Sequence, residues 1–409
     1  MKNKPHSLTL KSIKFALRNL ILKTAHFLQK LIFLRKTRKE ILLICNGPVM
    51  AQHLGQVLDI FKNDLRLNFS YLECFSINEI PNSSANISKQ LKTRRTSSRR
   101  ALLKNWDLII VADHTMPSLI DSQDCPTIYM GHGLETGKFV DNESYKLGSR
   151  SIKEDGECRY SSFLVASNYI VENQTRNKAP FPKLMFVSGD PVVDDLLNRQ
   201  EKRESIRHKL GIKENQIAVY VMSTWGPNCL WQTIGDEILV RIKDLQSEYR
   251  FFLGAHPNEF RPRNDGGRSW GLHLQKQNGF IVVDPTQDWK DYLTACDVIV
   301  GDHTSHMLYG ALLSRPLVFM NLDKNLIEEG SLPSRLMQIS PKLKDDASNL
   351  GSSILDAIEN YPAHERNAIH KDIVSHPGRS HDRIRTHIYN TLHLPNPQKS
   401  ETKTSASVS

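Results

Sequence analysis

Strand-like and helical stretches alternate along most of this 409-residue chain, and this alternation limits the folds that it can adopt. The candidate strands are short and apolar, and they form two series: Glu40–Cys45, Phe69–Phe75, Asp107–Ala112, Thr127–Met130, Phe163–Ala166 and Leu184–Ser188, then Ile217–Met222, Arg250–Gly254, Phe280–Val283, Val298–Val300 and Leu317–Met320. Strands separated by helices predict parallel sheets with crossover connections. The sequence therefore predicts an α/β fold with two doubly wound, Rossmann-like domains.

We expect the two domains to join near residues 190–215, because the charged segment Asn198–Lys213 suits a connecting helix and linker. The predicted limits are 40–195 for the N-terminal domain and 196–393 for the C-terminal domain. Residues 1–39 precede them as a basic arm, and we expect residues 394–409 to be a disordered tail because Ser400–Ser409 is small and polar. Ligands of such folds bind at the carboxyl ends of the strands, here in the cleft between the domains.

The positive charge of the chain belongs almost entirely to the arm. The formal net charge is +10, and residues 1–39 hold eleven Lys or Arg and no Asp or Glu. The remaining residues therefore sum to about −1, which makes a diffuse basic surface for nucleic acid inconsistent with the composition. We expect no nucleic-acid partner.

The arm from Leu8 to Leu34 has the pattern of an amphipathic helix, with its apolar residues on one arc and its lysines and arginines outside it. It contains no apolar run near the roughly 20 residues that span a bilayer, and no signal-peptide pattern. Two interpretations remain open: the helix lies on an anionic membrane surface, or it packs on the body of the protein. We favour the membrane surface, because a packed helix would not exclude acids over 39 residues.

A second basic run, Lys89–Arg100, lies inside the first predicted domain. Such runs are usually solvated surfaces, and the alternative is an extension of the membrane or polyanion contact of the arm. The six cysteines show no CxxC pair and no metal-ligand spacing, which is typical of free thiols in a reducing compartment. The sequence therefore predicts a cytoplasmic protein, peripheral on the inner face of the cell membrane.

The segment Asp297–Pro316 has the pattern of a buried strand, a polar turn and a helix. Asp302, Thr304 and Ser305 offer oxygens that cap the helix N-terminus. Phosphate binds readily at such a terminus, because unpaired backbone N–H groups and the positive end of the helix dipole meet there. An ordinary strand–helix junction remains the alternative.

Three further polar clusters follow predicted strands, where this fold would place an active site. They are Gly131-His132-Gly133 with Lys138, Ser223-Thr224-Trp225-Gly226, and His256-Pro257-Asn258-Glu259. Two glycines around a histidine allow close approach of a ligand, and histidine is the most versatile general base at neutral pH. For His132, a turn residue without a catalytic role is the alternative.

The order of these motifs resembles the CDP-glycerol glycerophosphotransferases of teichoic acid and capsule synthesis, which have a GT-B-type fold. The matching pieces span roughly residues 107–390: Gly131-His132-Gly133 with Lys138, Ser188–Asp194, Ser223-Thr224-Trp225, His256-Pro257, Asp297–Ser305, Ala311–Pro316 and Gly378-Arg379-Ser380. The resemblance implies transfer of glycerol phosphate, or a related polyol phosphate, from a CDP-activated donor to a hydroxyl of a membrane-linked glycan. CDP-glycerol or a similar nucleotide, a lipid-linked glycan and an anionic membrane are the implied partners.

The resemblance also implies roles for single residues. His132 would take the proton of the acceptor, and His256 would stabilise charge on the diphosphate. Thr304 and Ser305 would bind the diphosphate oxygens, and the acceptor would lie on the N-terminal domain and the donor nucleotide on the C-terminal domain. The remaining expected donor-binding residues are Lys138, Ser223, Thr224, Glu259, Asp302 and His303. No resident cofactor or metal ligand is predicted, and a requirement for a divalent metal is left open.

The chain departs from the family pattern where positive charge is expected. Gly226 and Gly254-Ala255 stand where the family often has arginines, the lysine after the His-Gly pair is displaced by one residue, and His303 replaces a usual tyrosine. Lys138, His303 or His306 would then have to supply the missing charge. The alternatives are a GT-B glycosyltransferase or an enzyme like UDP-N-acetylglucosamine 2-epimerase, which Ser188–Asp194 also resembles, and a non-catalytic nucleotide-binding scaffold.

Overall fold

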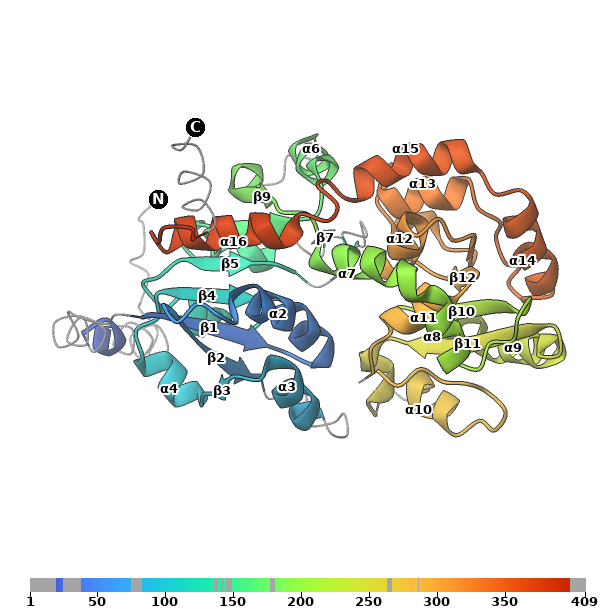
Figure 1. Ribbon diagram of the computed structural model, residues 1–409, viewed down its shortest axis with the longest axis horizontal. Helices are drawn as coiled ribbons and strands as arrows, with labels where there is room; N and C mark the ends of the chain where they lie inside the picture. The colour runs from blue at the N-terminus through green and yellow to red at the C-terminus, as the bar shows by residue number, and fades with distance from the viewer. Residues whose placement is uncertain are drawn as a thin grey trace, which may run out of the picture.

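The structure, a computed structural model, describes residues 20–24, 38–74, 83–131, 133–134, 139–140, 143–144, 149–176, 181–262, 267–285 and 287–397. It contains two parallel sheets that lie beside each other (Figure 1). The order of the first sheet is β3-β2-β1-β4-β5-β8-β9, with bounds Arg94–Arg95, Leu67–Glu73, Lys39–Cys45, Leu108–Val111, Thr127–Tyr129, Ser162–Val165 and Met185–Val187. The order of the second is β11-β10-β12-β13, with bounds Tyr249–Ala255, Ile217–Ser223, Val298–Gly301 and Leu317–Phe319. The predicted α/β fold with two parallel sheets is confirmed.

Helices cover both faces of each sheet. The first sheet carries α2 to α6 and α16: Pro48–Phe61, Ser83–Leu91, Ser98–Leu103, Pro117–Ile120, Asn168–Arg176 and Ser380–Thr391. Helices α7 and α8, Pro191–Arg199 and Arg203–Lys209, lead to the second sheet. The second sheet carries α9 to α15: Leu230–Leu245, Trp270–Gln275, Lys290–Ala295, Ser305–Leu312, Leu332–Gln338, Leu350–Glu359 and Ala363–Ile373. A short antiparallel pair, β6 (Phe139–Val140) and β7 (Glu143–Ser144), lies outside both sheets.

The central strands are buried on both faces, which explains their continuous apolar sequences. In β1, Ile41 and Leu43 face the core shared with α2 and α16, whereas Leu42 and Ile44 face the opposite core. The second sheet divides its strand residues between two cores in the same way. The alternation fixes the register, because a shift by one residue would exchange the two faces.

One predicted strand is wrong. Phe280–Val283 forms only an isolated bridge, between Leu253 and Val282, before the chain turns at Asp284-Pro285. A proline cannot donate to a ladder, so pairing stops there. Conversely, the edge strand β3 lies inside the basic run Lys89–Arg100, where its charge and short length concealed it.

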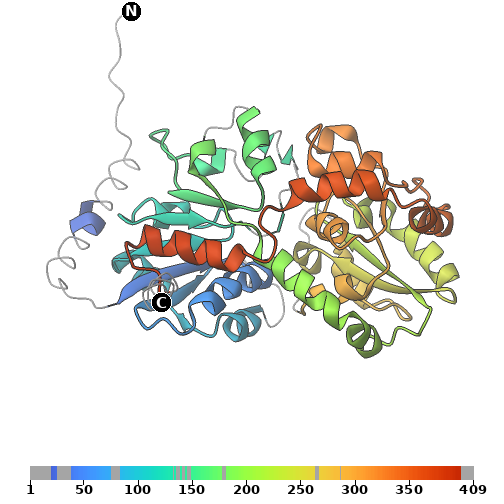
Figure 2. The ribbon, with the colours of Figure 1, turned by 45° about the horizontal axis from the view of Figure 1, so that its top comes forward.

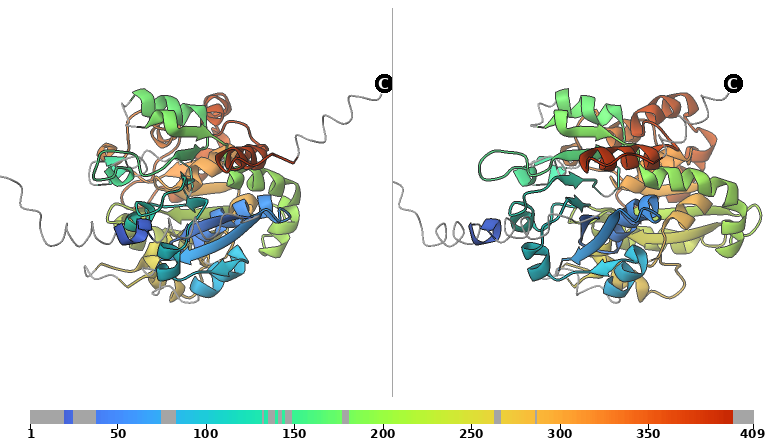
Figure 3. Two further views of the ribbon diagram at one scale, coloured as in Figure 1. Left: turned by 90° about the vertical axis from the view of Figure 1, so that its left-hand side faces the viewer. Right: turned by 60° about the vertical axis from the view of Figure 1, so that its left-hand side comes forward.

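The chain crosses between the two sheets twice, through α7 and again before α16 (Figure 2, Figure 3). Helix α16 buries Ile384 and Ile388 in the core of the first sheet, and the Tyr389 hydroxyl donates to Asp64 Oδ2 at 2.7 Å. The alternation of strands and helices did not indicate this return, and the domain limits 40–195 and 196–393 stay a prediction.

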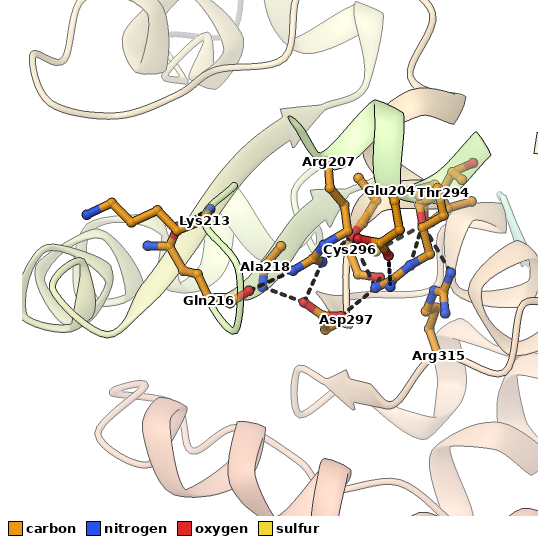
Figure 4. A network of polar contacts seen from close by, with 12 residues as sticks. Glu204, Arg207, Lys213, Gln216, Ala218, Thr294, Cys296, Asp297 and Arg315 are labelled. Carbon is orange, nitrogen blue, oxygen red and sulfur yellow. Dashed lines mark hydrogen bonds and ion pairs between the residues drawn. The ribbon is translucent and has the colours of Figure 1, made fainter. Parts of the chain in front are cut away.

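Asp297 fixes the amino end of β12. Its carboxylate accepts hydrogen bonds from Arg203, from Arg207 Nη1 at 2.9 Å and from the backbone N–H of Ala218 at 2.8 Å (Figure 4). These contacts bind α8 and β10 to the start of β12. The polar residues that follow β12 lie at the opposite end of the strand, so their position is set by a rigid element.

The basic arm lies outside the described residues except for residues 20–24, which are helical, and Arg38 and Lys39 at the start of β1. Of the tail, only residues 394–397 are described. Within the described parts of the chain, no helix is both long and apolar enough to cross a bilayer. All six cysteines are free thiols.

Candidate active site

The carboxyl ends of β10 and β12 lie side by side where the strand order of the second sheet reverses. Connections leave such a point toward opposite faces, and the crevice between them is where open α/β sheets bind ligands. Ser223 ends β10, and the segment Asp302–Ser305 follows β12. The first sheet has the same reversal between β1 and β4, and α2 starts there.

A hollow between the two domains opens at these strand ends. Its volume is about 670 Å³, including space open to solvent. The first domain contributes His53 of α2 and Gly133, and an adjoining hollow shares both of them. The second domain contributes three residues that the sequence predicted: His256, Thr304 and Ser305.

Gly133 lies against the first turn of α12. Its φ is +77°, and a Cβ built on it would lie 2.8 Å from Ser305 Oγ. Only glycine combines this backbone conformation with so close an approach. The loop that contains His132 therefore contacts the start of α12, although His132 and Lys138 themselves lie outside the described residues.

Helix α12 begins with the arrangement that an anion requires. Thr304 is its N-cap, and its hydroxyl accepts a hydrogen bond from the backbone N–H of His306. Ser305 is the first residue of the helix and lines the hollow. The N-terminal N–H groups and the helix dipole favour negative charge at this end.

His256 directs a hydrogen-bond donor to its surroundings. Its Nδ1 accepts from the backbone N–H of Asn258 at 3.1 Å, at the start of the 3₁₀ turn Pro257–Phe260. Because Nδ1 is an acceptor, the proton of the neutral ring lies on Nε2. His256 is therefore suited to donate to a phosphate oxygen.

Asp302, Ser223 and Thr224 lie in a buried hydrogen-bond network that joins neighbouring elements. The Asp302 side chain is fully buried and accepts from Ser223 Oγ at 2.8 Å, from Thr224 N at 3.0 Å and from Leu230 N at 3.0 Å. These bonds tie the end of β10 and the start of α9 to β12. Ser223, Thr224 and Asp302 do not line the interdomain hollow.

Glu259 and His303 are likewise buried beside the hollow rather than in its wall. The Glu259 carboxylate accepts from Gln232 Nε2 at 2.9 Å and from Gly226 N at 3.4 Å. It thereby joins the loop after β10 to the turn that begins with His256. Neither residue lines the hollow, and their assignment to donor binding stays a prediction.

His306 lines the hollow but is uncharged. Its ring packs edge-on against Trp289 at 4.2 Å between centroids, and burial lowers its pKa to about 3. A neutral ring at physiological pH supplies no positive charge. The replacement of a family arginine by His306 therefore stays a prediction, and burial of the ring does not favour it.

His53 is a candidate that the sequence did not reveal. It is buried on α2 and lines both interdomain hollows beside Gly133. A lone histidine in an apolar helix resembles a core residue, and only the position of α2 after β1, at the reversal of strand order, could have indicated it.

Two distant pieces of the motif pattern pack on each other at the chain crossings. Asp194 of α7 accepts from the backbone N–H groups of Gly378 and Ser380, and from the Ser380 hydroxyl. Asp190 caps α7 and accepts from the Tyr309 hydroxyl of α12 at 3.1 Å. The Ser188–Asp194 segment therefore connects the two domains and supports α12.

Among the residues that the structure describes, no three His, Cys, Asp or Glu side chains converge as metal ligands would.

A model of the family described as CDP-Glycerol:Poly(glycerophosphate) glycerophosphotransferase matches residues 30–366. The chain belongs to this family. As a member of the glycerophosphotransferase family, it is a transferase.

Solved structures share the fold of this glycerophosphotransferase-family protein at low identity. A variant of the wall teichoic acid polymerase TagF is 15% identical with a TM-score of 0.61, and the match covers 95% of this chain and 99% of that chain. A TagF variant soaked with CDPG is 14% identical with a TM-score of 0.59, and the match covers 95% of this chain and 99% of that chain. UDP-GlcNAc 2-epimerase from Neisseria meningitidis, bound to UDP-GlcNAc, is 13% identical with a TM-score of 0.52, and the match covers 87% of this chain and 99% of that chain. No curated protein sequence matches the chain.

Proposed function

We propose that this protein transfers glycerol phosphate, or a related polyol phosphate, from a CDP-activated donor to a hydroxyl of a membrane-linked glycan during cell-surface polymer synthesis. The observation that carries the proposal is the interdomain hollow. His256, the start of α12 and Gly133 all line it, and Gly133 lies against Ser305. Family membership supplies the reaction class.

In the proposed reaction the acceptor oxygen attacks the phosphorus that carries the glycerol. The bond from that phosphorus to the bridging oxygen breaks, and CMP leaves with the electron pair. The helix terminus at Thr304 and Ser305 holds the diphosphate, and the Nε2–H of His256 donates to an oxygen that gains charge. His132, by the family resemblance, takes the proton of the acceptor hydroxyl.

Neutral hydrogen-bond donors carry more of the electrostatic stabilisation here than in relatives with arginines. Gly226 and Gly254 stand where those arginines are expected, and burial lowers the pKa of His306, which lines the hollow. We therefore expect weaker retention of the diphosphate. The expected result is a higher KM for the donor, rather than a different reaction.

The test uses the purified full chain with CDP-glycerol, CDP-ribitol and UDP-GlcNAc, and measures release of CMP or UDP in the presence of a lipid-linked glycan. His256→Gln should lower kcat by roughly 100-fold or more, the size of a lost transition-state donor. The matched control is His364→Gln, an exposed histidine on α15, which should retain full activity. Release of no CMP by the parent protein, or full activity of His256→Gln, contradicts the proposal.

The arm supplies the membrane part of the proposal. Its eleven basic residues and amphipathic pattern suit an anionic cytoplasmic surface. Removing residues 1–37 leaves β1 intact and should weaken sedimentation with phosphatidylglycerol vesicles. Equal sedimentation of the two forms would show that the arm is not the anchor.

A further inference from the structure

Helix α3, the edge strand β3 and helix α4 follow one another along the outer edge of the first sheet (Figure 1). Exposed basic side chains occur on all three and in the turn between α3 and β3. We call this surface the basic edge; its members are Lys89, Lys92, Arg94, Arg99 and Arg100. Residues 83–104 contain no Asp or Glu. Among described residues, none of the five forms an ion pair, whereas their neighbours Arg95 and Lys104 are paired with Glu73 and Glu40.

The basic edge begins where the arm joins the body. Lys104, directly after α4, lies 2.6 Å from Glu40 of β1, and Lys39 lies 3.4 Å from Asp107. The end of α4 is therefore next to the first residues of β1. Residues 20–24 of the arm lie on the same side of the molecule as α4 (Figure 1, Figure 3).

The other end of the basic edge reaches a second cleft between the domains. Lys89 and Lys92 line this cleft, whose other charged residues are mixed in sign: Arg199 and Lys290 pair there with Asp195, Asp288 and Asp291. This cleft borders the interdomain hollow that His256 and Ser305 line, because Asp284 and Gln287 line both spaces. The basic edge thus connects the arm with the space beside the candidate active site.

Two large apolar side chains are exposed near the same start of the sheet. Leu65 is 75% exposed before β2, and Leu103 is 39% exposed at the end of α4. The amino ends of parallel strands lie at the same end of the sheet, so both leucines are near the start of β1, where the arm joins the body. Cations combined with exposed leucines are the chemistry that an anionic bilayer binds.

Edge protection explains only part of the charge. Arginines on β3 prevent another strand from pairing with the sheet. Lys89, Arg99 and Arg100, however, lie on helices, where they block no pairing. Edge protection therefore does not account for these three side chains.

We propose that the basic edge binds an anionic lipid bilayer together with the arm, and that this contact holds the cleft beside α3 at the membrane surface. The second part rests on the proposed function, since a membrane-linked acceptor would then reach the cleft without leaving the bilayer. The first part stands on charge and exposure alone. The occupant is a bilayer because the basic edge ends beside Glu40 of β1, next to the exposed Leu65 and Leu103, and because the arm that precedes β1 in the sequence is basic and amphipathic.

The experiment compares the full chain with the triple variant Arg94→Gln/Arg99→Gln/Arg100→Gln. Sedimentation is measured with phosphatidylcholine vesicles that contain or lack phosphatidylglycerol. Each cation near an anionic surface contributes a factor of about five, so the triple variant should bind on the order of 100-fold more weakly. The matched control, Lys213→Gln/Lys243→Gln/Lys276→Gln, removes exposed cations of the second domain and should bind as the parent does.

The outcomes separate the alternatives. Equal vesicle binding by the triple variant and the parent overturns the proposal. Unchanged vesicle binding with lost retention on immobilised polyphosphate would identify a path for a soluble polyanion instead, and would also overturn it. With a soluble acceptor, the triple variant should release CMP at the parental rate and lose rate only on vesicle-borne acceptor. If the parent releases no CMP from any donor, the proposed function fails while the vesicle result still decides the basic edge.

Discussion

Replacing Asp302 tests whether the polar residues after β12 act on the donor or on the fold. In Asp302→Ala the hydroxyl of Ser223 and the backbone N–H groups of Thr224 and Leu230 lose their acceptor in a dry environment. Each unsatisfied buried donor costs about 1–3 kcal/mol. Relief of the buried carboxylate offsets part of this, so we expect the free energy of unfolding to fall by roughly 3–6 kcal/mol.

Asp302→Asn separates the structural role from a binding role. An amide oxygen placed at the Oδ2 position retains the bonds from Ser223 and Leu230, and the lost charge costs about 1–2 kcal/mol. We expect this variant to retain kcat and the KM for CDP-glycerol within about threefold, because Asp302 does not line the hollow.

The assay is urea unfolding followed by tryptophan fluorescence, which reports mainly on the second domain because four of the five tryptophans lie there: Trp225, Trp231, Trp270 and Trp289. Asp244→Ala, an exposed carboxylate of α9, is the control and should change stability by at most about 0.5 kcal/mol. An Asp302→Ala protein as stable as the parent would refute the structural assignment. So would an inactive Asp302→Asn protein of parental stability.

Three further predictions concern neighbouring features. Gly133→Ala should lower kcat at least about 10-fold, because the added Cβ displaces the loop from Ser305. The control is Gly156→Ala: Gly156 has a similar φ of +84° but no atom within 4 Å of an added Cβ. It should lose only about 1–2 kcal/mol of stability and no activity. Burial lowers the pKa of His306 to about 3, so as pH falls below about 6.5 the unfolded chain binds a proton at this residue before the folded chain does. The free energy of unfolding should therefore fall by about 2 kcal/mol between pH 8 and pH 5 because of His306. His306→Gln should flatten that part of a profile of urea midpoint against pH. Ser380→Ala should destabilise the contact with Asp194 by about 1–2 kcal/mol and speed amide exchange in α16, with exposed Ser352→Ala as the unaffected control.

Local sequence predicted the strands because burial on both faces leaves a continuous apolar run, as in β1 and β12. Phe280–Val283 has the same composition, but Pro285 and a single bridge limit its pairing. The return of α16 to the first sheet could not be predicted in this way. Its apolar stripe shows that one face is buried without showing against which sheet.

The sequence placed polar residues correctly at strand ends but could not assign their partners. Thr304 and Ser305 reach the hollow, whereas Asp302 and Glu259 accept from neighbouring backbone or side-chain donors. Spacing does not separate these cases, because a residue that shapes the site and one that contacts the ligand differ only in side-chain direction. His53 was missed for the complementary reason, since an apolar helix hides its approach to the other domain.

The position of α16 also determines the order in which the molecule can be completed during synthesis. The ribosome releases β1 to β9 first, and the whole second sheet follows before Ile384 and Ile388 arrive to cover the first core. The earlier domain therefore waits with an uncovered apolar face while the later one is being translated, a state that is prone to aggregation and in need of chaperones. A released chain truncated before residue 380 would bind such a chaperone strongly, and the full chain would not.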